Sequence, residues 1–108
     1  MLPAAYRLRA SAEFAATTRK GKRVPRPDLV LHFLADQGIH PRVGYVVSKA
    51  VGGSVTRHAV SRKLRAATAP FLTELSPGTY VIRAFPSAAE RSVGELATQI
   101  GTALGGCK

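Results

Sequence analysis

The chain of 108 residues has a single cysteine, no tryptophan and no long apolar run. Cys107, one residue from the end, has no second thiol to pair with, which excludes an internal disulfide and fits a reducing compartment. The N-terminal MLPAAYRLRAS lacks the apolar stretch of a signal peptide, and no segment approaches the ~20 apolar residues of a membrane span. We therefore expect a cytoplasmic protein with no membrane partner.

Acidic residues are also scarce. Six Asp and Glu stand against 16 Lys and Arg, which gives a formal net charge of +10. Residues 1–65 hold 13 of the basic and three of the acidic residues, so the whole excess lies there and the remainder is balanced. One-sided positive charge of this kind is typical of a nucleic-acid binder. An anionic membrane surface, or charge kept for solubility, are the alternatives.

The shortage of carboxylates also bears on catalysis. Protein-only hydrolysis of a phosphodiester usually needs clustered carboxylates that hold Mg²⁺, or a pair of histidines. His32, His40 and His58 fall on an expected strand, turn and helix, without the spacing of metal ligands. The six acids occur singly, at Glu13, Asp28, Asp36, Glu74, Glu90 and Glu95. We therefore expect no catalytic residue and no metal ligand in this chain, so chemistry would have to come from a partner.

The apolar pattern of the first half predicts a short helix and three strands. The helix covers SAEFAATTRKG, with Ser11 as its cap. Pro25 and Pro27 then exclude a helix and allow only an edge-strand fragment around Arg23 and Val24. Strands are expected over 28–35 and 42–50, the second with Val43, Tyr45 and Val47 on one face. The six-residue link between these two strands suggests an antiparallel hairpin.

The second half predicts two helices and a strand. A helix capped by Ser54 should begin at Val55 and run to about residue 75, with Pro70 either kinking it or starting a second segment. A strand over 79–85 and a closing helix over 86–104 follow, and Gly105 and Gly106 are expected to end the ordered chain. The predicted class is therefore α+β, a single domain over 1–108 in the order α-β-β-β-α-β-α.

The helix that begins at Val55 carries an unbalanced basic face. At 100° per residue, its apolar stripe is separate from a polar side that holds Arg57, Ser61 and Arg65, with His58 and Arg62 further round. Arg57 and Arg65 lie about 12 Å apart along the axis, which is comparable to two phosphate steps. Arginine suits bidentate contact with phosphate. Lys63 falls off this face and is expected to be merely solvated, and a solvated face is also the alternative for the whole set.

The start of this helix adds a second basic feature. Gly52, Gly53 and Ser54 leave N–H groups exposed where the helix dipole is positive, and Lys49 precedes them. Such a turn can seat a phosphate.

The stretch VVSKAVGGSVTRHAVSRKLRAA resembles the signature of the protein subunit of bacterial ribonuclease P. That family has a Val-Ser-Lys-Lys-like run, a glycine, and a helix with an Arg-Asn-Arg core followed by Lys-Arg and a further Arg. The departures are Ala50, His58, Ala59 and Ser61, which replace the second Lys, the Asn, the second core Arg and a Lys. FAATTRKGKRVPRPDLVLHFL and TYVIRAFPSAAERSVGELATQI resemble the flanks, so the resemblance covers nearly the whole chain. Positions that match the pattern are Val47, Ser48, Lys49, Gly52, Val55, Arg57, Val60, Arg62, Leu64 and Arg65.

The resemblance implies the fold, the partners and the sites. The fold would be a sandwich like the second domain of a small-subunit ribosomal protein, with the basic helix in a left-handed crossover. A catalytic RNA would supply the active site and bind Mg²⁺, while the protein binds precursor tRNA, and no protein partner is implied. Contacts to the catalytic RNA would come from Lys49, Gly52, Gly53, Arg57, His58, Ser61, Arg62 and Arg65.

The resemblance also implies a cleft between the first helix and the sheet that holds the single-stranded 5′ leader. Phe14 matches one of its aromatic residues, whereas Thr18 and His32 replace two others, so we expect weaker base stacking and more phosphate contact. The phosphate contacts would come from Arg19, Lys20 and Lys22. Plain core packing is the alternative for Phe14. Two other functions stay open, a ribosomal or ribosome-assembly protein on the same fold and a self-sufficient nuclease.

Overall fold

The computed structural model describes residues 6–8, 11–35 and 41–106. With the short 3₁₀ helices set aside, its elements follow the predicted order α-β-β-β-α-β-α, which is confirmed. Asp36, His40 and Cys107 lie outside the described residues. The elements are α1 (Ser11–Lys20), β1 (Lys22–Pro25), β2 (Leu29–Ala35), β3 (Arg42–Val46), η2 (Lys49–Val51), α2 (Ser54–Thr68), η3 (Ala69–Glu74), β4 (Gly78–Ala84), η4 (Pro86–Glu90) and α3 (Val93–Gly106).

The four strands form one sheet in the order β1-β2-β4-β3. β2 pairs antiparallel with both β1 and β4, whereas β3 and β4 run parallel. The predicted hairpin of the strands over 28–35 and 42–50 is therefore wrong, because β4 lies between them. β4 takes this central place because both of its faces are buried, with Val81 and Ile82 at 0% and 1% exposure. The chain from β3 to β4 crosses through α2, and the left-handed sense of that crossover stays a prediction.

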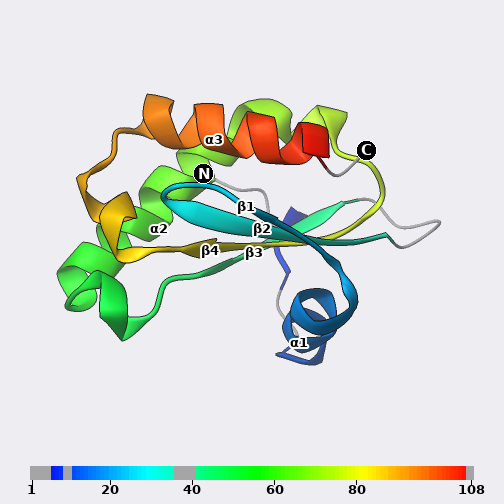
Figure 1. Cartoon of the computed structure of the whole chain (residues 1–108), viewed down its shortest axis with the longest axis horizontal. Helices are drawn as coiled ribbons and strands as arrows, with labels where there is room; N and C mark the ends of the chain where they lie inside the picture. The colour runs from blue at the N-terminus through cyan, green and yellow to red at the C-terminus, as the bar shows by residue number, and fades with distance from the viewer. Residues whose placement is uncertain (1–5, 9–10, 36–40, 107–108) are drawn as a thin grey trace.

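The helices cover the two faces of the sheet unequally (Figure 1). α2 and α3 lie together on one face, and α1 lies alone on the other. Strand alternation sends the large apolar side chains toward α2 and α3. Leu29 and Leu31 of β2 and Ile82 of β4 share the core there with Leu64 of α2 and Ile100 of α3, and all five are at most 1% exposed. The opposite face is only partly covered by α1, which leaves room for a site there.

α1 is held on its face by polar as well as apolar contacts. The hydroxyls of Thr17 and Thr79 are 2.6 Å apart, and Glu13 forms an ion pair with Arg42. Gly21 lets the chain turn tightly from α1 into β1, since a Cβ there would lie 2.4 Å from the carbonyl oxygen of Thr17. These contacts hold α1 over the end of the sheet where β3 and β4 begin, and α1 also packs on β2 and β1. The opposite end of the same face, at Val30 and Arg83, stays open.

Several helix boundaries differ from the prediction. α2 ends at Thr68, and Pro70 lies at the start of η3, so the second of the two alternatives for this proline is confirmed. The closing helix starts at Val93 rather than residue 86, because Ser92 and Glu95 cap it reciprocally through their backbone N–H groups. It also continues through Gly106, the last described residue, so the helix ends two residues later than the predicted residue 104.

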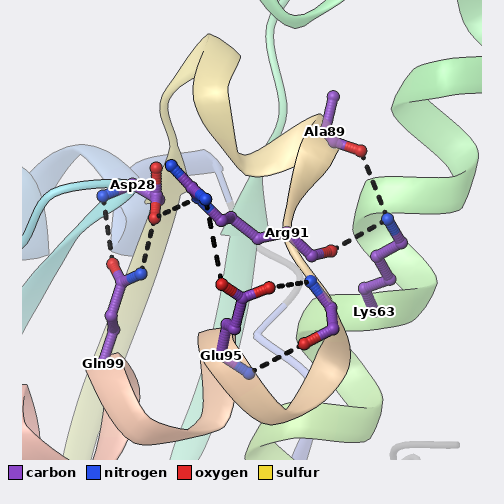
Figure 2. Close-up of polar contacts among 7 residues, drawn as sticks. Asp28, Lys63, Ala89, Arg91, Glu95 and Gln99 are labelled. Atoms are coloured by element: carbon purple, nitrogen blue, oxygen red, sulfur yellow. Dashed lines mark hydrogen bonds and ion pairs between the residues drawn. The ribbon is translucent and has the colours of Figure 1, made fainter.

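A polar cluster fixes η4 to the rest of the fold (Figure 2). The Asp28 carboxylate, 5% exposed, accepts hydrogen bonds from Nε of Arg91 at 3.0 Å and Nε2 of Gln99 at 2.6 Å. The backbone N–H of Phe85 donates to the carbonyl oxygen of Asp28. Lys63 of α2 donates to the carbonyl oxygens of Ala89 and Arg91. Lys63 was predicted to be merely solvated, and this is wrong because the unpaired carbonyls of η4 lie within its reach.

Candidate nucleic-acid interface

The polar side of α2 faces away from the core along the outer edge of β3. Val60 and Leu64 are buried against the sheet, which turns Arg57, Ser61 and Arg65 toward the edge strand. The guanidinium carbon of Arg65 lies 5.9 Å from the centroid of the Tyr45 ring, in a cation–π contact. The predicted grouping on α2 is thus present. We call Arg57, His58, Ser61, Arg62 and Arg65 the α2 basic face.

A shallow pocket of about 300 Å³ lies between this face and β3. It is lined by Tyr45, Val47, Ser54, Arg57, His58 and Ser61. The Arg57 Nε is buried without a hydrogen-bond partner among the described residues, whereas the Tyr45 hydroxyl faces the side chain of Thr68. Burial raises the pKa of Tyr45 to about 12, so its hydroxyl is a neutral donor. An unsatisfied guanidinium N–H in this basic pocket favours an anionic, oxygen-rich ligand.

The N-terminus of α2 is open. Its capping position is Gly53, with no side-chain hydrogen bond, so the prediction that Ser54 caps the helix is wrong: Ser54 is already helical. Gly52 has φ +152°, a conformation that a larger residue rarely adopts, and a Cβ at Gly53 would meet nothing within 4 Å. Lys49 is exposed in η2, just before this turn. The first N–H groups of α2 therefore face outward beside a cation.

A larger groove of about 520 Å³ lies on the α1 side of the sheet. We call it the α1-side groove. α1, β1, β2, β4, η2 and the segments that flank η2 and η4 all contribute to it. Its lining residues are Thr18, Arg23, Val30, His32, Ser48, Ala50, Arg83, Ala84, Phe85 and Pro86.

Strand alternation explains why two arginines and a histidine meet in this groove. Arg23 lies directly opposite His32 in the β1–β2 register, and Arg83 lies opposite Val30, two residues from His32 on the same face. No carboxylate of the described residues forms an ion pair with either arginine. His32 is 8% exposed, and burial, then Arg23 and Arg83, lower the pKa of its imidazole below 6.5. The floor of the groove is therefore positive even with a neutral histidine.

The residues predicted for a leader cleft divide between several places. Thr18 and His32 line the α1-side groove, although Thr18 also donates to carbonyls of its own helix. Arg19 and Lys20 are exposed on α1 outside the lining. Lys22 points to the other face of β1, since it alternates with Arg23, and it does not line the groove.

Phe14 occupies a separate position. Its ring covers Gly44 of β3, where an added Cβ would lie 2.3 Å from the ring carbon Cζ. It lines another pocket, of about 280 Å³, that reaches Ser61 and Arg65 of the α2 basic face. Phe14 is half-buried and is not in the main core cluster. An aromatic ring thus stands between α1 and the α2 basic face, across the edge of the sheet.

Sequence reasoning assigned only Thr18 and His32 of this lining to a leader cleft, and it missed the other residues. Arg23 was assigned only to an edge-strand fragment, and Ser48, Arg83 and Phe85 were given no role in the groove. For Arg23 a signal existed: once the β1 fragment is paired with β2, alternation puts Arg23 beside His32. For Arg83 and Phe85 there was none, because the hairpin prediction left β4 away from β2.

Among the described residues, no three His, Cys, Asp or Glu side chains come together as metal ligands would. The same part of the chain has no helix with the length and apolar character that crossing a membrane requires.

Comparison with known proteins identifies the family. The sequence model of the Ribonuclease P family matches residues 2–108. The Ribonuclease P protein component of Mycobacterium sp. (strain KMS) is 50% identical over 107 residues, covering 96% of this chain and 91% of that protein. That of Beutenbergia cavernae is 49% identical over 106 residues, covering 96% and 89%. These matches do not favour a ribosomal or ribosome-assembly protein.

The fold has close structural counterparts. The RNase P protein from Staphylococcus aureus superimposes with a TM-score of 0.85 at 23% identity, covering 95% of each chain. The RNase P protein from Thermotoga maritima gives 0.82 at 19% identity, covering 94% of this chain and 97% of that one. At these identities the likeness concerns the fold alone, and the family rests on the sequence matches. The chain belongs to the family of bacterial ribonuclease P protein components.

Proposed function

We propose that this chain binds the catalytic RNA of ribonuclease P through the α2 basic face and the 5′ leader of precursor tRNA through the α1-side groove. The observation that carries the proposal is the presence of two separate basic surfaces, on different faces of the sheet. Neither surface has its arginines neutralised by carboxylates of the described residues. Lys49, Gly52 and Gly53 extend the first surface with open N–H groups.

The bond-breaking step belongs to the RNA in this proposal. The described carboxylates are either paired with arginines, as Glu13, Asp28 and Glu95 are, or exposed and far apart in the sequence, as Glu74 and Glu90 are. Mg²⁺, bound through the RNA, would supply charge stabilisation at the reacting phosphate. The protein contributes affinity for precursor tRNA over mature tRNA, because only the precursor has a leader.

The first test concerns the α2 basic face. Arg57→Ala combined with Arg62→Ala should weaken binding of the catalytic RNA and flatten its dependence on salt, by roughly 0.7–0.9 in log–log slope for each lost phosphate contact. Arg26→Ala is the matched control, because this arginine lies after β1 and contacts its own neighbour, Pro25. Filter binding at several salt concentrations measures both slopes. An unchanged slope in the double variant would rule out this face.

The second test asks whether the protein alone can cleave precursor tRNA and whether the α1-side groove recognises the leader. The reconstituted complex should remove the leader, and the purified chain alone should not cut precursor tRNA at any Mg²⁺ concentration. Ala50→Trp places a large ring at the exposed edge of the α1-side groove. It should reduce the preference for precursor over mature tRNA while leaving affinity for the catalytic RNA unchanged. Cleavage by the chain alone would favour a self-sufficient nuclease and overturn the proposal.

A further inference from the structure

The floor of the α1-side groove contains a histidine in an unusual setting. His32 is more than nine-tenths buried, and its Nδ1 has no hydrogen-bond partner among the described residues. A buried polar nitrogen that is left unsatisfied costs free energy, and native structures have few of them. Here the unsatisfied ring lines an open groove, so a ligand could change both its hydrogen bonding and its charge.

The groups around this ring are all neutral or positive. β1 contributes Arg23 and β4 contributes Arg83, while α1 contributes the hydroxyl of Thr18 and the segment before η2 that of Ser48. No described carboxylate lines the groove. Two arginine forks and an imidazole that converge from adjacent strands match the several oxygens of a phosphodiester better than the flat edge of a base.

We propose that Arg23, His32 and Arg83 form a subsite for one backbone phosphate of single-stranded RNA, and that its occupation is coupled to protonation of His32. The proposal rests on the groove's proposed role in leader binding and adds which chemical group is bound there and how pH controls it. It makes recognition in this groove independent of base identity at that position, because a phosphodiester is the same in every nucleotide.

The direction of the pH effect follows from the charges. Burial and the two arginines keep the pKa of His32 below 6.5 in the free protein. A bound phosphate adds a negative charge beside the ring and raises that pKa. Between the free and bound values, binding takes up a proton, so affinity rises as pH falls, by up to about tenfold per pH unit. Above and below this window His32 has the same charge in both states, and the dependence disappears.

The test uses the full chain and a fluorescein-labelled single-stranded RNA of about eight nucleotides. Fluorescence anisotropy from about pH 5 to about pH 8 measures the affinity, and the NMR shift of the His32 ring measures its pKa with and without RNA. In the wild type, affinity should rise toward acid pH and RNA should raise the pKa. His32→Gln should give a flat profile, and a circular-dichroism spectrum like that of the wild type shows that the variant is folded.

Two controls isolate the subsite. Glu90→Gln removes an exposed titratable group at the end of η4, outside the groove lining, and should keep the wild-type pH profile. Arg83→Gln should weaken binding and shift the pKa of His32 up toward its ordinary value in the free protein, since one positive neighbour is gone. A methylphosphonate at one position of the RNA, which removes that phosphate's charge, should abolish the pH dependence. Competition of the labelled RNA by inorganic phosphate alone tests whether the subsite binds a free anion rather than the phosphate of an RNA backbone.

The result that overturns the subsite is a wild-type pH profile in His32→Gln, or a pKa of His32 that RNA does not change. Stronger competition by inorganic phosphate than by RNA would overturn it as an RNA site. Failure of the broader proposal looks different, because Ala50→Trp would then leave the preference of the reconstituted complex for precursor tRNA intact. If Ala50→Trp removes the preference while His32→Gln keeps the pH profile, the groove binds the leader without this subsite.

Discussion

Replacing Asp28 by alanine should destabilise the fold by about 3 kcal/mol. Its carboxylate accepts hydrogen bonds from Nε of Arg91 at 3.0 Å and Nε2 of Gln99 at 2.6 Å, and its side chain is 5% exposed. A hydrogen bond to a charged group contributes about 1.5–3 kcal/mol. The bond to Arg91 belongs near the low end, since that side chain is 43% exposed and can be resolvated. The loss is large against the roughly 5–15 kcal/mol that stabilises a small domain.

Urea unfolding followed by circular dichroism at neutral pH measures this loss. Glu90→Ala, which removes an exposed carboxylate at the end of η4, is the matched control and should leave the midpoint unchanged. Combining Asp28→Ala with Gln99→Ala should cost less than the sum of the two single changes, because both remove the same contact. A loss under about 0.5 kcal/mol for Asp28→Ala would refute the reasoning, since a surface substitution does as little.

The pH dependence gives an independent check. A hydrogen bond from Ser87 is the largest of the effects that lower the pKa of Asp28 below 3.8. Hydrogen bonds from Gln99 and Arg91, together with the positive charge of Arg91, lower it as well, whereas burial raises it. Because the folded pKa is below the unfolded one, the stabilisation is fully present above pH 3.8 and is lost as pH falls through the folded pKa. The difference between wild type and Asp28→Ala should therefore be constant near neutral pH and shrink in strong acid.

Two further substitutions test how the surfaces are held. Gly44→Val should displace the Phe14 ring, since even a Cβ there would lie 2.3 Å from Cζ. It should cost roughly 1–3 kcal/mol of stability as overpacking, measured by thermal unfolding. Gly105→Ala, where a Cβ meets nothing, is the control, and an unchanged Gly44→Val protein would show that Phe14 is free to move. Lys63→Met should loosen η4 from α2, because it removes the two hydrogen bonds that Lys63 donates to the carbonyl oxygens of Ala89 and Arg91. Amide hydrogen exchange at Arg91 should then become faster. Arg62→Met, which changes an exposed neighbour, is the control, and equal exchange in the two variants would contradict the prediction.

Local pattern was enough to predict much of this protein. Alternation and helical spacing place the strand over 28–35, the strand over 79–85 and the helix after Ser54 within a few residues. The side of α2 that carries Arg57 and Arg65 followed from the helical period alone, because the apolar stripe of Val60 and Leu64 must face the core. The matched signature added the family, which the curated relatives confirm.

The strand order could not be read in the same way. A short link between two apolar strands favours a hairpin, yet β4 displaces that pairing because it offers a longer apolar partner to β2 and a parallel one to β3. Periodicity describes only the faces of one strand, and it has no information on which strand lies beside which. The hydrogen bonds from Lys63 to the carbonyl oxygens of Ala89 and Arg91 could not be predicted for the same reason.

The sequence by itself determined the charge, the element order and the direction in which each side chain points from its own backbone. Only the tertiary structure decided that Arg23, His32 and Arg83, from three different strands, lie on one floor, and that Phe14 stands apart from them. The physical reason is that a groove is made where elements distant along the chain meet, and those meetings depend on the burial of the whole sheet.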